Sequence, residues 1–213
     1  MIHVPKDAAP WAEVHIDLIV ELPKTKEGFQ HIFVAKDSLT KFVCMVPLRT
    51  KTATEVGKAM VDEVYCRFGV ARKIYSDRGR EFQNNIQAAI NGMLRQYQQF
   101  TTAYHPQANG QVENQNRTIK DALAAYINMH HSDWDVFLPL ITHAYNTTVN
   151  DATGYSPFRA LYGREAAQPT DSWIKASLGV SDQTLSTYVS GLQRVLLETW
   201  GNIAEAIAKG HQW

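Results

Sequence analysis

The feature that most constrains the fold is a change in the spacing of apolar residues along the first half of the chain. Three short runs rich in Val, Ile and Phe are separated by turn residues and predict strands joined as an antiparallel meander: residues 12–22, 29–36 and 42–48. From Thr52 the apolar residues recur at helical spacing. Thr52 and Glu55 form a capping box that predicts a helix start, and Gly69 predicts its end.

The rest of the chain continues with both kinds of element. Residues 70–76 predict a fourth strand, and the apolar spacing predicts helices over the following ranges: 81–97, 111–129, 134–148, 158–162 and 182–208. This order of strands and helices is that of an α/β domain, in which helices flank a mixed sheet.

Composition and charge narrow the classes of protein to consider. No apolar run approaches the roughly 18 residues of a membrane span, and the first 20 residues lack a signal-peptide pattern, so we expect no membrane partner. The 21 Lys and Arg residues balance 21 Asp and Glu residues. A neutral chain that binds duplex DNA needs a local basic surface or further segments that supply phosphate contacts. Cys44 and Cys66 form no CxxC pair, so we expect no zinc.

Three acidic residues lie inside an apolar run, directly after a strand, or at the start of a helix. Asp17 lies inside the first apolar run, Asp77 directly follows the fourth strand, and Glu113 opens a helix after a loop that contains Pro and Gly. Mg²⁺ prefers carboxylate oxygens, and phosphoryl transfer with two metal ions needs carboxylates that hold both. Taken singly, each acid has another interpretation: a salt bridge, a turn cap and a favoured helix N-terminus, respectively.

Four motifs in the same order resemble one family. Asp17, Asp77 and Glu113 resemble the D,D-35-E triad of retroviral and retrotransposon integrases, with 35 residues between the last two acids. SDRGREF (76–82) resembles the segment around the second acid of that family. YHPQANGQVENQNRTIK (104–120) is similar to its Tyr-x-Pro-Gln loop and Glu helix, most of all in gypsy-type elements. GYSPFRALYGR (154–164) resembles the gypsy-type motif that closes the core domain.

The resemblance implies a particular architecture. The expected fold is RNase H-like, a five-stranded mixed sheet flanked by helices, with a C-terminal helical extension. The chain would comprise an N-terminal tail (1–10), the catalytic core (11–165) and a helical extension or linker (166–213). Family members also carry an N-terminal zinc domain and a C-terminal β domain or chromodomain. Neither is visible in this sequence, which predicts a fragment or a divergent or domesticated relative.

The resemblance also implies a reaction, DNA integration by a polynucleotidyl transferase or metal-dependent endonuclease. Asp17, Asp77 and Glu113 would bind two Mg²⁺ or Mn²⁺ ions. A DNA 3′-hydroxyl would attack a phosphodiester in strand transfer, or water would do so in 3′-end processing. The expected partners are double-stranded DNA, from element ends and target, and further copies of the chain in a homodimer or larger homo-oligomer. The expected location is the nucleus, or a cytoplasmic particle before nuclear entry.

Residues near the third acid are candidates for DNA contact. Asn116, Arg117 and Lys120 follow Glu113 by three, four and seven residues, which places them on its side of a helix. The resemblance implies that they approach DNA, with Tyr104 in the loop near the attacking group. A solvated polar face is the alternative for this stripe.

The role of the other basic residues is undecided at this point, and two other functions remain as alternatives. Arg72, Lys73, Arg78 and Arg80 form either a small basic rim around the second acid or ordinary surface. A different class of function is a domesticated core that acts as a protein-interaction module without catalysis. An RNase H-type nuclease would share the metal ions, but the Tyr-x-Pro-Gln loop and the 35-residue spacing disfavour it.

Overall fold

The computed structural model describes residues 9–76, 85–86, 88–90, 132–167 and 185–210. The chain divides into two compact units. The first, which we call the sheet unit, comprises Pro10–Ser38 and Val43–Tyr145, and the second, the C-terminal unit, comprises Met1–Ala9, Leu39–Phe42 and Asn146–Trp213. The domain boundary expected near residue 165 stays a prediction.

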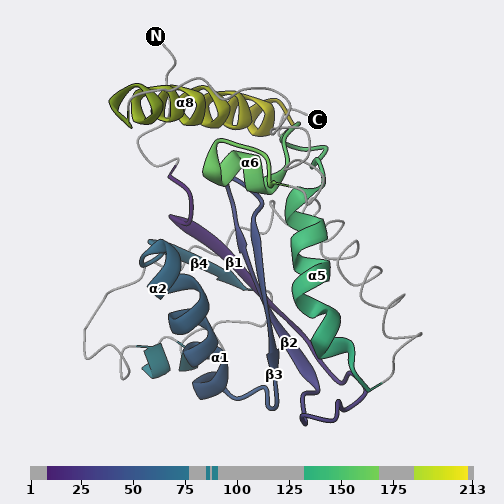
Figure 1. Ribbon diagram of the computed structural model, residues 1–213. Helices are drawn as coiled ribbons and strands as arrows, with labels where there is room; N and C mark the ends of the chain where they lie inside the picture. Colours follow the sequence, from purple (N-terminus) through teal and green to yellow (C-terminus); the bar gives the residue numbers. More distant parts are fainter. Residues whose placement is uncertain (1–8, 77–84, 87, 91–131, 168–184, 211–213) are drawn as a thin grey trace. The chain divides into compact units, whose positions relative to one another are not determined.

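The sheet unit is built on a mixed sheet, as expected. Its strands are β1 (Glu13–Ile19), β2 (His31–Asp37), β3 (Val43–Leu48) and β4 (Lys73–Ser76), in the spatial order β3-β2-β1-β4 (Figure 1). β2 is antiparallel to β1 and β3, whereas β4 is parallel to β1. The described part of the chain thus contains four strands where five were expected, and the antiparallel meander is confirmed.

The helix predicted from Thr52 is confirmed and contains a wider segment. It runs through α1 (Ala53–Met60), the π-helical η1 (Val61–Tyr65) and α2 (Cys66–Phe68). The hydroxyl of Thr52 accepts the backbone N–H of Glu55 at 3.3 Å, as the capping box requires. The Glu55 carboxylate accepts backbone N–H groups of Arg49 and Thr50 instead of closing the box on Thr52. Gly69 ends the helix with φ +92°, which suits glycine.

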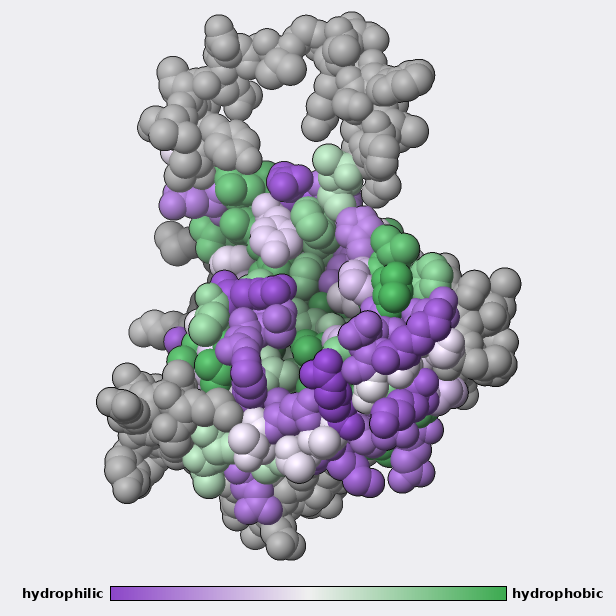
Figure 2. Space-filling model, turned by 60° about the horizontal axis from the view of Figure 1, so that its bottom comes forward, coloured by the Kyte–Doolittle hydropathy of each residue, from purple (hydrophilic) through white to green (hydrophobic). Residues whose placement is uncertain are grey.

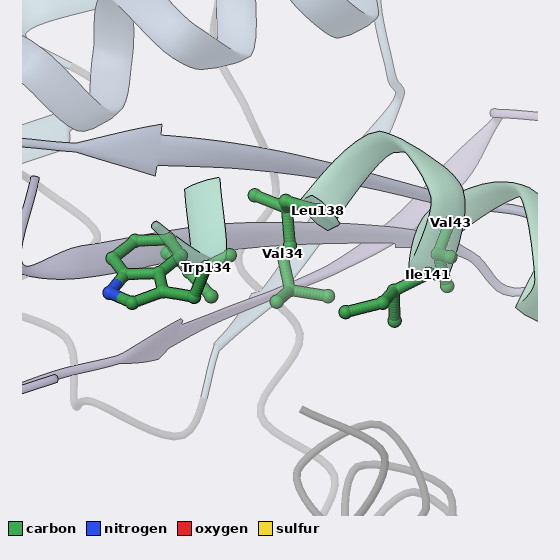
Figure 3. Close-up of a cluster of buried hydrophobic side chains, with 6 residues drawn as sticks. Val34, Val43, Trp134, Leu138 and Ile141 are labelled. Carbon is green, nitrogen blue, oxygen red and sulfur yellow. The ribbon is translucent and has the colours of Figure 1, made fainter. Parts of the chain in front are cut away.

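A long helix, α5 (Trp134–Thr147), covers one face of the sheet, as the apolar pattern over 134–148 predicted. Its buried Trp134, Leu138 and Ile141 pack against Val34 of β2 and Val43 of β3 (Figure 3). The indole Nε1 of Trp134 also donates a 2.8 Å hydrogen bond to the carbonyl of Pro23, which fixes the start of the helix to the β1–β2 connection.

On the opposite side of the sheet from α5 lies α1, so the sheet is covered on both faces (Figure 1). Gly57 of α1 lies so close to the helical residues Ile86 and Ala89 that an added Cβ would stand 3.2 Å from the Cβ of Ala89. Ile86 and Ile90 are buried here, which confirms helical structure at this part of the predicted helix 81–97. The helix predicted over 111–129 lies outside the described residues.

Two helices form the described core of the C-terminal unit, α6 (Pro157–Tyr162) and α8 (Leu185–Gly210), as predicted at 158–162 and 182–208. Ala160 and Ile203 are buried together, and Trp200 Nε1 donates to the carbonyl of Ala160 at 2.8 Å. Gly163 ends α6 with φ +70°. Within the described ranges, no helix has both the length and the apolar character to cross a membrane.

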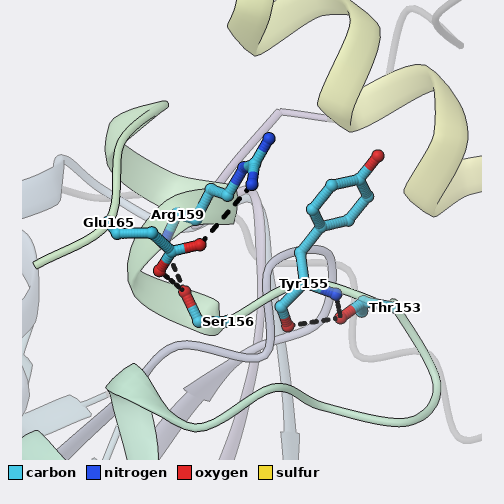
Figure 4. Close-up of polar contacts among 5 residues, drawn as sticks. All are labelled: Thr153, Tyr155, Ser156, Arg159 and Glu165. Atoms are coloured by element: carbon cyan, nitrogen blue, oxygen red, sulfur yellow. Dashed lines mark hydrogen bonds and ion pairs between the residues drawn. The ribbon is translucent and has the colours of Figure 1, made fainter.

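The motif at 154–164 is held together by polar contacts among its own residues and with the adjoining Thr153 and Glu165 (Figure 4). Ser156 caps α6 by accepting the N–H of Arg159, and its hydroxyl donates to Glu165 at 2.7 Å. The guanidinium of Arg159 lies 3.6 Å from the same carboxylate and 5.3 Å from the centre of the Tyr155 ring. The hydroxyl of Thr153 bonds both backbone groups of Tyr155. These contacts give the motif a structural role in closing α6.

Candidate active site

Asp17 lies at the centre of β1, in the middle of the sheet. Side chains of a strand alternate between its faces, and in β1 the buried Val14, Ile16 and Leu18 alternate with less buried residues that include Asp17. Asp17 is paired with Val34, which packs against α5. The carboxylate therefore belongs to the α5 face of the sheet, and its Oδ1 accepts the N–H of Leu18 at 2.7 Å.

The parallel pairing of β1 and β4 bears directly on the predicted pair of aspartates. Ile16 is the partner of Ser76, the last residue of β4. Asp17 and Asp77 are the next residues of the two chain segments in sequence. Asp77 itself lies outside the described residues, so the described geometry ends one residue before the second acid.

An aromatic and ionic cluster lies beside Asp17 on the same face of β1 and β4. The rings of His15 and Tyr75 are stacked with centroids 4.8 Å apart and planes inclined by 20°. The Tyr75 hydroxyl donates to Glu13 at 3.1 Å, and the Lys73 ammonium binds the other oxygen of Glu13 at 2.7 Å. Burial, together with the nearby Glu13 carboxylate, raises the pKa of Tyr75, so the hydroxyl stays neutral at physiological pH.

This cluster revises one sequence interpretation and adds residues that sequence reasoning missed. Lys73, considered there as part of a basic rim, is ion-paired with Glu13. Neither His15 nor Tyr75 was singled out. The available signal was the period-two spacing of Glu13, His15 and Asp17, which places all three on one strand face.

Two charged residues at the end of β2 are buried, which the sequence did not reveal. Asp37 is fully buried, and its Oδ1 accepts the backbone N–H of Trp11 at 2.8 Å. That bond fixes the approach of the chain to β1. Lys36 is only 4% exposed and is paired with His15, on the same face of the sheet as Asp17.

Most of the site predicted from the sequence lies outside the described residues: Asp77, Tyr104, Glu113, Asn116, Arg117 and Lys120. Among the residues that the structure describes, no three His, Cys, Asp or Glu side chains gather as a metal site would require. Asp17 is thus the one triad member whose surroundings are known, and the complete triad stays a prediction.

The loops at one end of the sheet unit carry charges of both signs. The β1–β2 and β3–α1 connections lie at the bottom of Figure 1 and come forward in Figure 2, where hydrophilic residues cover much of the lower part of the view. Glu21 lies 3.8 Å from Lys51, and the guanidinium of Arg49 donates to the carbonyl of Glu27. Acidic and basic groups are therefore mixed at this end of the sheet unit.

Comparison with known sequences finds relatives among the polyproteins of retroviruses and retrotransposons. The chain is 30% identical over 156 residues to the retrovirus-related Pol polyprotein from transposon 412 of Drosophila melanogaster, covering 73% of the chain and 13% of the polyprotein. It is 32% identical over 187 residues to the Pol polyprotein of feline endogenous virus ECE1, covering 86% of the chain and 18% of that polyprotein. The chain thus spans less than a fifth of either polyprotein. No family model matches the sequence.

Comparison with solved structures defines the class of fold. The catalytic core domain of BIV integrase superposes with a TM-score of 0.52 at 22% identity, covering 78% of this chain and 99% of that one. The HTLV-2 integrase catalytic core domain, solved in complex with magnesium in a trimeric form, gives 0.51 at 18% identity, covering 70% and 95%. The fold is therefore the RNase H-like fold of integrase catalytic cores.

Sequence relatives and fold together identify the family. The chain belongs to the retroviral-type integrases, and its relationship to transposon 412 is consistent with the gypsy-type character of its motifs.

Proposed function

We propose that this chain is an integrase catalytic core that joins DNA strands by phosphoryl transfer with two divalent metal ions. The observation that carries the proposal is the position of Asp17, a carboxylate at the centre of a sheet, one residue beyond the point where β1 pairs with the end of β4. The next residue after β4 is Asp77. A carboxylate supplied by Asp77 beside that of Asp17 would give the arrangement that a pair of metal ions needs.

The donor chemistry at Asp17 fits a hard divalent cation. Mg²⁺ and Mn²⁺ take oxygen ligands, and a carboxylate on a rigid central strand holds its oxygens in a fixed position. A related integrase core was solved with magnesium, which supports the same class of ion for this chain. Bound ions would supply positive charge that stabilises the reacting phosphate and activates the attacking oxygen.

The three acids would have separate duties in this proposal. Asp17 and Asp77 would hold the ions, and Glu113 would complete the set of carboxylate ligands. In the proposed reaction a DNA 3′-hydroxyl, or water during 3′-end processing, would attack the scissile phosphate in line with the strand oxygen that leaves as a hydroxyl. The protein thus contributes positioning and electrostatic stabilisation, which phosphoryl transfer mainly requires.

DNA contacts are proposed for residues around the third acid. Tyr104 would lie by the attacking group, and Asn116, Arg117 and Lys120 would bind the backbone of the same DNA. Replacement of Lys120 by Ala should lower affinity for any DNA sequence and reduce the dependence of log K on log salt by about one unit.

We also propose that the chain self-associates. Val136 and Leu140 lie one turn apart on α5 and are 66% and 63% exposed. Large exposed apolar residues at such spacing favour association, and the related HTLV-2 core was solved as a trimer. Light scattering should show an assembly that dissociates on dilution. The Val136→Glu, Leu140→Glu double variant should have a lower mass in solution than the wild-type chain. Equal mass for both proteins would contradict this use of α5.

The function is tested by joining of a labelled donor duplex to target DNA with Mg²⁺ or Mn²⁺. The full-length protein should produce joined strands, and its Asp17→Asn variant should produce none because it removes one charged ligand oxygen. Asp62→Asn is the matched control, since Asp62 is an exposed residue of η1 that pairs with Lys58. A full-length protein that is inert with both ions would contradict the proposal and favour the protein-interaction module.

A further inference from the structure

The strongest unexplained feature of the described structure is the stacked pair of rings beside Asp17. His15 and Tyr75 come from different strands, pair directly in the β1–β4 register, and lie on the same face as Asp17. Because side chains two apart on a strand share a face, the ring of His15 begins about 7 Å along the strand from Asp17. None of the roles proposed for the acids uses these rings.

The pair is built to hold its orientation. Tyr75 is fixed at one end by the strand and at the other by its hydroxyl, which donates to Glu13 at 3.1 Å. Glu13 is fixed in turn by Lys73 at 2.7 Å. A ring that is tethered at both ends loses little further freedom when it makes a contact, so it is preorganised for a flat partner.

The chemistry of the cluster suits a neutral, flat group better than a phosphate. Lys73 and Glu13 neutralise each other, so this ion pair adds no net attraction for an anion. Lys36, which pairs with His15 in the β1–β2 register, is buried. Both rings are half-buried and retain exposed surface. Stacking on aromatic side chains is how proteins hold nucleic-acid bases without regard to sequence.

We propose that His15 and Tyr75 form a stacking platform for an unpaired base at the end of the DNA strand whose phosphate lies at Asp17. This inference rests on the proposed function for the position of the phosphate. A base inside a duplex has both faces covered by its neighbours, so only an end or frayed base offers a face to the rings. The platform orients the strand end and takes no part in bond breaking, so its residues are positioning residues.

The test uses the whole chain and a single-stranded oligonucleotide that carries the fluorescent base 2-aminopurine at its 3′ end. EDTA is present so that binding is measured without chemistry. Stacking on the platform should quench the fluorescence, and Tyr75→Leu should abolish the quenching and weaken binding by about 5- to 150-fold, the range for loss of one stacked base. Tyr75→Phe is the matched control because it keeps the ring and removes only the hydroxyl.

Several outcomes would overturn the platform. The platform is refuted if the wild-type chain does not quench the fluorescence, or if the quenching survives Tyr75→Leu. It is also refuted if Tyr75→Phe loses as much quenching as Tyr75→Leu, which would assign the effect to the hydrogen bond with Glu13. If the probe base is quenched as strongly inside a blunt duplex as at the 3′ end of the single strand, an unpaired end is not the ligand. His15→Leu provides a second variant with the same expected loss, so a folding defect at Tyr75 does not decide the result. The melting temperature of each variant is measured alongside.

The same proteins separate this inference from the proposed function. Asp17→Asn should keep the quenching while losing strand joining. A wild-type chain that joins DNA but whose Tyr75→Leu variant binds and quenches normally would refute the platform alone. A chain that never joins DNA, yet loses quenching with Tyr75→Leu, would refute the enzyme and retain the platform.

Discussion

Trp134 anchors α5 to the sheet, and its replacement gives a prediction whose size follows from the structure. Its side chain is fully buried among Val34, Leu138 and their neighbours, and its Nε1 donates to the carbonyl of Pro23 at 2.8 Å. Trp134→Ala removes the ring and the bond and leaves a cavity. The expected loss in the free energy of unfolding is about 3–5 kcal/mol.

Trp134→Phe separates the two contributions. It keeps an aromatic ring in the core but removes the donor to Pro23, which contributes about 1 kcal/mol net. With a smaller cavity added, the expected loss is roughly 1–2.5 kcal/mol, clearly less than for Ala. Urea unfolding followed by far-UV circular dichroism measures both variants against wild type. Equal losses for Phe and Ala, or a loss below about 1 kcal/mol for Ala, would refute the account of how α5 is held.

Three further variants or reactions test other parts of the structure. Gly163→Ala should lower the free energy of unfolding by about 1–3 kcal/mol, because φ is +70° and the new Cβ would lie 2.8 Å from Leu192 Cδ1; an unchanged stability would contradict the positive φ. A thiol reagent should label the exposed Cys66 in the native protein but leave Cys44 unlabelled until unfolding, because burial raises the pKa of the Cys44 thiol to about 12. Labelling of both thiols at once would contradict the burial of Cys44. Burial acts to raise the pKa of Glu55, but hydrogen bonds from neighbouring groups lower this pKa overall. Glu55→Gln should therefore destabilise the protein above pH 4.5 and match wild type once the pH falls below the pKa of Glu55 in the folded state. Urea midpoints that differ equally at pH 3 and pH 7 would contradict this.

The sequence predicted most of the described elements because their signals are local. Alternating and helical apolar spacing marked β1 to β3, α5 and α8, while Thr52, Gly69 and Gly163 marked helix ends. The predicted first strand, 12–22, was too long, since β1 ends at Ile19. The π-helical segment Val61–Tyr65 was not anticipated, because widening of a helix leaves the apolar spacing over one turn nearly unchanged.

The surroundings of Asp17 could be predicted only in part. The alternation in β1 indicates which residues share its face. That His15 meets Tyr75, 60 residues later, depends on the register of two parallel strands, and no local turn sets that register. The burial of Lys36 and Asp37 was not expected, because charged residues at the end of a strand are rarely fully buried.

The carboxylate of Asp17 is proposed to bind a catalytic metal ion, and exchange of its oxygen for sulfur gives the most direct test. Strand joining is measured for Asp17→Cys with Mg²⁺ and with Mn²⁺, beside Asp62→Cys as control. Thiolate is a poor ligand for Mg²⁺ and a better one for softer ions. Asp17→Cys should lose joining with Mg²⁺ and regain part of it with Mn²⁺, while Asp62→Cys should work with both. Wild-type joining by Asp17→Cys in Mg²⁺ would contradict metal binding by Asp17.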